Sequence, residues 1–191
     1  MSTEALTETR PAGAPFPAEI LGSKDVRIDR DEAGRIIARY TLHDGVLNGP
    51  AIFYDSEGRV TQRCVFVGGH LDGMLESWSG GRLTQRAHFR GGQLDGPTIL
   101  FDAQGRVSQQ IGFLAGKRHG ETLVLRDGKL QARMQFRDDL QDGLFETFDE
   151  QQRPTVRAEF RAGLQHGETL HFDAAGRVTA RLAFEHGELQ A

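Results

Sequence analysis

The chain has 191 residues and a formal net charge of −4, with 24 glycines, 12 phenylalanines and a single cysteine. One cysteine excludes an intramolecular disulfide and a cysteine-based zinc site, and the acidic balance argues against nucleic-acid binding by the molecule as a whole. No run reaches the roughly 18 apolar residues that a membrane helix needs. The composition therefore predicts a soluble chain that is rich in Gly and Phe.

Residues 1–24 differ from the rest of the chain, because they hold three of the six prolines and show no alternating apolar pattern. They also lack the basic and apolar regions of a secretory signal. We predict a mostly disordered leader, and a cytoplasmic protein, since the cytoplasm is the default compartment without a signal. The alternative for residues 16–21 is a short linear motif.

From residue 25 onward, the sequence repeats with a period of 23 or 24 residues. In most units a glycine precedes a phenylalanine by eight residues, and a second glycine follows that phenylalanine by seven. The phenylalanines are Phe66, Phe89, Phe113, Phe136, Phe160 and Phe184, and the second glycines are Gly49, Gly73, Gly96, Gly120, Gly143 and Gly167. Self-similarity at such a fixed period indicates stacked units that share one continuous core.

Each unit has the pattern of a β-hairpin. Residues 51–66 hold a short apolar run, the turn 55–58 and a longer alternating run. Asp55 and Gly58 suit the first and fourth positions of a type I turn, with the glycine in the left-handed region. The link to the next unit ends in Asn-Gly, Asp-Gly or His-Gly, which favours a tight turn with positive φ. We predict an all-β fold in which residues 25–191 form a single elongated array of about seven stacked antiparallel hairpins.

Period-2 alternation sorts the strand residues into columns. In the second strand of each hairpin, the column of Val60, the column of Cys64 and the phenylalanine column are expected on one face, as one continuous apolar stripe. In the first strand, an aromatic column follows the column of Ile52; it consists of Tyr54, Trp78, Phe101, Leu125, Phe148 and Phe172.

Two series of basic residues accompany the hairpins. The first follows the turn glycine and consists of Arg35, Arg59, Arg82, Arg106, Lys129, Arg153 and Arg177. The second stands four residues later and consists of Arg39, Arg63, Arg86, Arg133, Arg157 and Arg181, with Gln110 as its exception. Both series are expected on the face opposite the phenylalanines. Two interpretations remain open: a solvated face on which the turn aspartates pair with arginines, or a docking face for an acidic surface.

The spacing Phe-x2-Gly-x3-Gly-x4-aromatic-Asp-x2-Gly-[Arg/Lys] is clearest in residues 89–106 and 160–177. It resembles the variant form of the MORN repeat, and the resemblance covers residues 25–191. It implies a stack of β-hairpins. Bacterial chains built solely of this variant are grouped with YwqK-like antitoxin components, which implies a non-enzymatic partner of a toxin, such as an antitoxin or immunity protein. The pattern is broken at Asp139 and Gln152, where glycine is replaced, and at Trp78, in a shortened unit.

The sequence predicts no catalytic, cofactor or metal site, because the seven histidines fall at different repeat positions and Cys64 lies in a buried column. We therefore expect a non-enzymatic module that binds another protein, a toxin or effector, and neither nucleic acid nor membrane. The alternative is a structural or assembly scaffold that self-associates through open terminal strands. Anionic-lipid binding through the arginines is a weaker alternative.

The candidate contact residues form two groups. The alternation of side chains predicts that the two groups lie on opposite sides of the sheet. The favoured group consists of aromatic anchors of the kind that dominate protein interfaces: Tyr54, Trp78, Phe101 and Phe148. The other group is Arg63, Arg86, Arg106, Arg133 and Arg157, for which solubility is a sufficient explanation.

Overall fold

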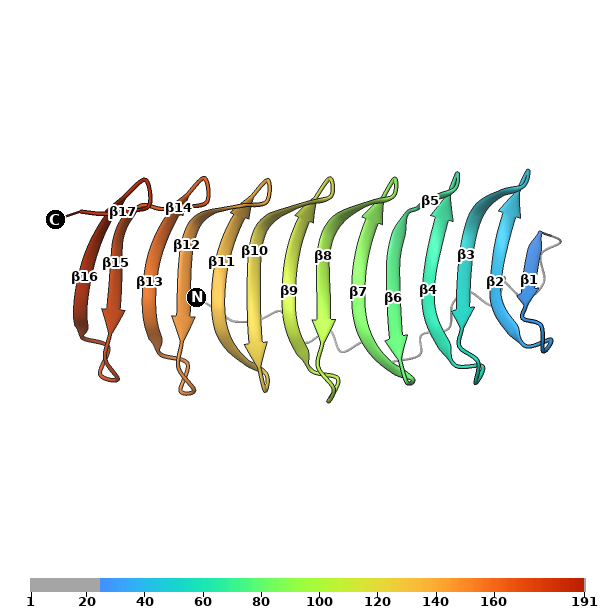
Figure 1. Cartoon of the computed structure of the whole chain (residues 1–191), viewed down its shortest axis with the longest axis horizontal. Coiled ribbons are helices and arrows are strands. Elements are labelled where there is room, and N and C mark those ends of the chain that lie inside the picture. The colour runs from blue at the N-terminus through green and yellow to red at the C-terminus, as the bar shows by residue number, and fades with distance from the viewer. Residues whose placement is uncertain (1–24, 191) are drawn as a thin grey trace, which may run out of the picture.

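The computed structural model describes residues 25–190, which form one antiparallel β-sheet of 17 strands with no helix. Successive long strands pair with one another, so the sheet runs in chain order from β1 at one end to β16 and β17 at the other (Figure 1). The predicted leader, residues 1–24, and the linear motif considered within it lie outside the described residues.

The strands are β1 (Val26–Arg30), β2 (Ile36–His43), β3 (Val46–Tyr54), β4 (Val60–Val67), β5 (His70–Leu71), β6 (Gly73–Ser79), β7 (Arg82–Arg90), β8 (Gln93–Phe101), β9 (Val107–Leu114), β10 (Lys117–Arg126), β11 (Lys129–Arg137), β12 (Leu140–Phe148), β13 (Pro154–Arg161), β14 (Leu164–Gln165), β15 (Gly167–Phe172), β16 (Val178–Glu185) and β17 (Glu188–Leu189). The predicted all-β hairpin array is confirmed. The count of about seven hairpins is not, because the connecting turns also join antiparallel strands.

The turn between β3 and β4 has the predicted geometry. The amide of Gly58 donates to the carbonyl of Asp55 at 3.0 Å, and Gly58 has a φ of 77°. The Asp55 carboxylate accepts hydrogen bonds from the amides of Glu57 and Arg59, both at 2.9 Å. At the equivalent position in a later turn, Gln152 adopts a φ of 63°, so the turn keeps its left-handed residue where the glycine is missing.

A β-bulge follows each of these turns, and it overturns one expectation. Phe53 pairs with Gln62, but Tyr54 pairs with Val60, which leaves Thr61 as an extra residue. One extra residue reverses the alternation of side chains. Val60 therefore lies on the face of Tyr54 and not, as predicted, in one stripe with Cys64.

The connecting turns lie earlier in the link than predicted. The tight turn between β4 and β5 is Gly68-Gly69, with φ values of 55° and 84°, as a type I′ turn requires. Gly73, at the end of the link, does have the expected positive φ, 99°, but it lies at an irregularity of the pairing rather than in the turn. The Asp72 carboxylate beside it accepts a hydrogen bond from the amide of Gly91 in the next connecting turn, at 3.0 Å.

The repeated phenylalanines lie opposite the repeated glycines. Phe66 pairs with Gly49 and Phe113 with Gly96, and the other units keep this arrangement. We call this side of the sheet the phenylalanine face; its row consists of Phe66, Phe89, Phe113, Phe136, Phe160 and Phe184. Every ring of the row is only half-buried. The buried residues of this face are small, such as Cys64 and Ala87, because a single layer lets larger neighbours cover only short side chains.

This partial burial sets the expected effect of Phe113→Ala. Full burial would make the substitution cost about 3–5 kcal/mol, whereas a half-buried ring on a one-layer sheet should lose about 1–3 kcal/mol. Urea and thermal unfolding would measure the loss. Leu114→Ala is the control, since Leu114 is 48% exposed and should change stability by no more than about 0.5 kcal/mol. Equal losses in the two variants would contradict the assignment of Phe113 to the packed row.

Candidate functional site

The second arginine series forms one row across the middle of the sheet. Arg39 pairs with Ile52, which pairs with Arg63; Arg63 pairs with Glu76, which pairs with Arg86. The same alternation of strands continues to the last hairpin. We call this side of the sheet the arginine face; its row consists of Arg39, Arg63, Arg86, Arg133, Arg157 and Arg181. It is opposite the phenylalanine face, as predicted.

The aromatic candidates lie on the arginine face as well, so their expected separation from the arginines is wrong. The guanidinium of Arg63 lies 5.2 Å from the ring centroid of Trp78, and that of Arg86 lies 5.9 Å from Phe101. In each case the ring stands two residues beyond the arginine's cross-strand partner, which is the diagonal position of an antiparallel pair. Alternation within one strand could not show that the rings and the arginines share a face, because they stand on different strands. Which residues of two strands share a face depends on the register of their pairing.

The repeat itself indicates that the arginine and the ring belong together. Arg157 contacts Phe172 in the same diagonal way, at 6.0 Å. Gln110 occupies the arginine position of its unit, and the corresponding diagonal residue, Leu125, is the one member of the aromatic column that is not aromatic. The two residue types are thus lost in the same unit, as expected if each supports the other through a cation–π contact.

Two glutamates that stand between arginines of the row, Glu146 and Glu76, neutralise part of its charge. Glu146 is 2% exposed and accepts hydrogen bonds from both Arg133 and Arg157, the latter at 3.0 Å. Burial raises the pKa of Glu146, but the hydrogen bonds from the two arginines outweigh this effect and lower the pKa. Glu76 pairs with Arg86 at 2.9 Å. Since removing one partner of a buried ion pair is strongly destabilising, these arginines serve the sheet as well as its surface.

The first basic series follows the turns directly, and its five members that come after a turn aspartate have the predicted aspartate partner. Arg106, one of the contact candidates, pairs with Asp102 at 2.9 Å and with Asp127 of the next turn at 2.7 Å. Arg153 pairs with Asp149 and also donates to the carbonyl of Ala174 in the following turn, at 2.8 Å. These side chains tie successive turns together, so Arg106 is part of a turn row and not of the central arginine row.

The turn aspartates make the array sensitive to acid. The amide and guanidinium of Arg106 lower the pKa of Asp102, and equivalent contacts lower the pKa of Asp31, Asp55, Asp149 and Asp173. A carboxylate whose pKa is lower in the folded chain stabilises the fold above its unfolded pKa of about 3.9. That contribution is lost as the pH falls through the folded pKa.

We expect Asp102→Asn to separate this charge effect from the turn geometry, because an asparagine keeps an oxygen acceptor but no charge. The variant should unfold at lower urea than the wild type at pH 7. The difference should narrow below about pH 4, where the wild-type aspartate also loses its charge. Urea midpoints measured from pH 7 to pH 2 test this. A difference that stays constant over that range would show that the charge has no role.

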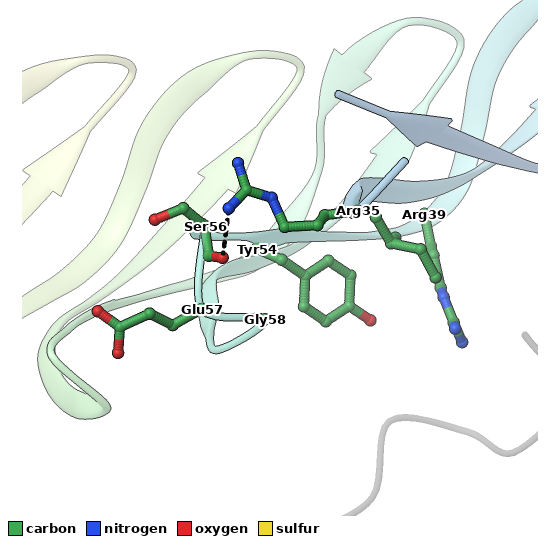
Figure 2. A pocket seen from close by; sticks show the side chains of 7 residues that line it. Arg35, Arg39, Tyr54, Ser56, Glu57 and Gly58 are labelled. Atoms are coloured by element: carbon green, nitrogen blue, oxygen red, sulfur yellow. Dashed lines mark hydrogen bonds between the residues drawn. The ribbon is translucent and has the colours of Figure 1, made fainter. Parts of the chain in front are cut away.

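A hollow of about 450 Å³ opens on the arginine face between the first two hairpins. Arg35, Arg39, Tyr54, Ile36 and residues 56–58 line it. Figure 2 shows the Tyr54 ring between the turn residues 56–58 and Arg39, and it shows Arg35 directed at Ser56. The hydrogen bond from Arg35 to the Ser56 carbonyl is 3.4 Å long. Tyr54 was predicted as a contact residue; Arg39 and the hollow were not.

The single cysteine, Cys64, is buried. Burial raises the pKa of the Cys64 thiol to about 11, so this cysteine stays protonated at neutral pH. Residues 25–190 contain no group of three or more His, Cys, Asp or Glu side chains arranged to hold a metal ion. Over the same residues, there is no helix with the length and apolarity to span a membrane.

No protein-family model matches the sequence, and a search of curated proteins also finds no match. The resemblance to variant MORN repeats and to YwqK-like antitoxin components therefore stays a prediction. The class that the structure defines is an open, single-layer sheet of repeated antiparallel hairpins.

Proposed function

We propose that this chain is a protein-binding repeat module whose contact surface is the arginine face. The observation that supports the proposal is the joint presence of arginine and aromatic side chains on one side of an extended sheet. Trp78 and Tyr54 are half-buried, and the side chains of Arg133 and Arg157 are 41% and 49% exposed. Tryptophan, tyrosine and arginine are the residues most enriched among the energetic centres of protein interfaces.

The arginine face favours a partner with apolar as well as acidic groups. Between Arg86 and Arg133, the paired positions across the sheet hold three uncharged residues, Ile99, Gln110 and Leu123. An uncharged centre with basic residues on both sides would complement an apolar centre with acidic residues around it. Such complementarity steers association and suppresses wrong partners more than it raises affinity.

The sequence resemblance supports one class of partner. We propose a toxin or effector as the partner and the cytoplasm as the compartment, as the similarity to YwqK-like antitoxin components implies. In this role the chain performs no chemistry. It neutralises the partner by occupying a surface that the partner needs.

Trp78→Ala tests the contact surface. Once the partner has been isolated with the wild-type chain as bait and purified, we expect the variant to bind it at least about tenfold more weakly, mainly through a faster off-rate. Added salt should also weaken wild-type binding, because the arginines and the rings share one face. If the partner is a toxin that arrests the growth of cells, co-expression of the wild-type chain should relieve the arrest, and co-expression of Trp78→Ala should not.

Two further variants make the result interpretable. Gln62→Ala is the matched control, since Gln62 is the exposed neighbour of Arg63 on the phenylalanine face. Phe101→Leu introduces the residue that the repeat itself uses at position 125, so it reduces the ring contact with little risk to folding. Charge reversal of Arg86 or Arg133 is unsuitable, because it would leave Glu76 or Glu146 facing another carboxylate. Equal binding by Trp78→Ala, Phe101→Leu and Gln62→Ala would refute the arginine face as the contact surface.

A further inference from the structure

Arg39 differs from the other members of the arginine row. Within residues 25–190, those other members have partners: rings for Arg63, Arg86 and Arg157, and carboxylates for Arg86, Arg133, Arg157 and Arg181. In the same part of the chain, Arg39 has no ion pair and does not lie over a ring. Its Nε atom is buried and has no hydrogen-bond partner among the described residues. A buried donor without an acceptor is unfavourable, the more so when it is charged.

The later units show which group pairs with an arginine of this row. Glu76 lies between Arg63 and Arg86 in the row, and Glu146 lies between Arg133 and Arg157. The equivalent position beside Arg39 holds Ile52. The first unit thus has the arginine but lacks the carboxylate that Glu76 and Glu146 supply in two of the later units. The space beside this arginine is the hollow of about 450 Å³.

The charges around the hollow leave one positive charge unbalanced. Arg35 pairs with Asp31 at 2.8 Å, and Glu57 on the rim pairs with Arg59 at 2.5 Å. Only the guanidinium of Arg39 lacks a counter-charge among the described lining residues. A single carboxylate would balance it, whereas a doubly charged phosphate would add a further negative charge close to Glu57.

We propose that this hollow binds one carboxylate side chain, an aspartate or glutamate of the bound protein, through the guanidinium of Arg39. The inference rests on the proposed function, because it takes the arginine face as the contact surface. Ile36 and the ring of Tyr54 supply an apolar wall for the methylene groups of the incoming side chain. The carboxylate balances the charge of Arg39, as Glu76 does for Arg86 and Glu146 does for Arg133 and Arg157.

A titration without any partner protein tests this site. The probe is N-acetyl-glutamate α-amide, which carries one side-chain carboxylate, and the neutral control compound is N-acetyl-glutamine α-amide. We expect the arginine Nε–Hε resonance of Arg39 and the amide resonances of residues 56–58 to shift saturably with the glutamate compound only. Sodium chloride and inorganic phosphate at matched ionic strength should produce smaller, non-saturating shifts.

Arg39→Gln should weaken the response of residues 56–58 at least about tenfold. Arg126→Gln is the matched control, because it removes one exposed positive charge at the end of β10, outside the hollow. Arg39→Lys keeps the charge without the planar fork and should bind with intermediate strength; it also serves if Arg39→Gln unfolds. Equal shifts with the glutamine compound, tighter binding of phosphate, or an undiminished response in both Arg39 variants would overturn the proposal. Such a result would leave the Trp78 test of the contact surface unaffected.

Discussion

A sheet one layer thick has no second layer against which to bury side chains, and residues 25–190 conform to this constraint. Among these residues, the buried apolar side chains are short: four alanines and one cysteine. The six repeated phenylalanines remain half-buried. Each hairpin is therefore stabilised by contacts with the hairpin before it and the hairpin after it, as in other quasi-one-dimensional repeat proteins.

These contacts between neighbouring hairpins recur at both ends of the strands and on the arginine face. Turn arginines such as Arg153 donate a hydrogen bond to a carbonyl of the next turn. Aspartates such as Asp72 accept a hydrogen bond from an amide of the next connecting turn. On the arginine face, Arg63 reaches the ring of the following hairpin. Side chains that connect neighbouring hairpins are thus also exposed on the arginine face, and for this reason we propose that they contact a partner protein.

The sequence was sufficient to predict the fold class and the turns that begin with aspartate, because Asp55 and Gly58 have local conformational requirements that the structure confirms. It was not sufficient to assign faces across a hairpin. The bulge at Thr61 inserts one residue, and nothing in the spacing of one strand reveals it. The aromatic column was therefore placed on the wrong side of the sheet relative to the arginines. Arg39 could not be singled out from sequence, since its lack of a partner depends on three-dimensional contacts.

We conclude that neighbouring hairpins are coupled through specific diagonal contacts on the arginine face. A double-mutant cycle at the place where both residue types are replaced tests this coupling, with Gln110→Arg, Leu125→Phe and the double variant compared by urea unfolding. We predict that the double variant is more stable than the sum of the single changes by about 0.5–1 kcal/mol, the size of an exposed cation–π contact. Strict additivity of the two substitutions would contradict the claim.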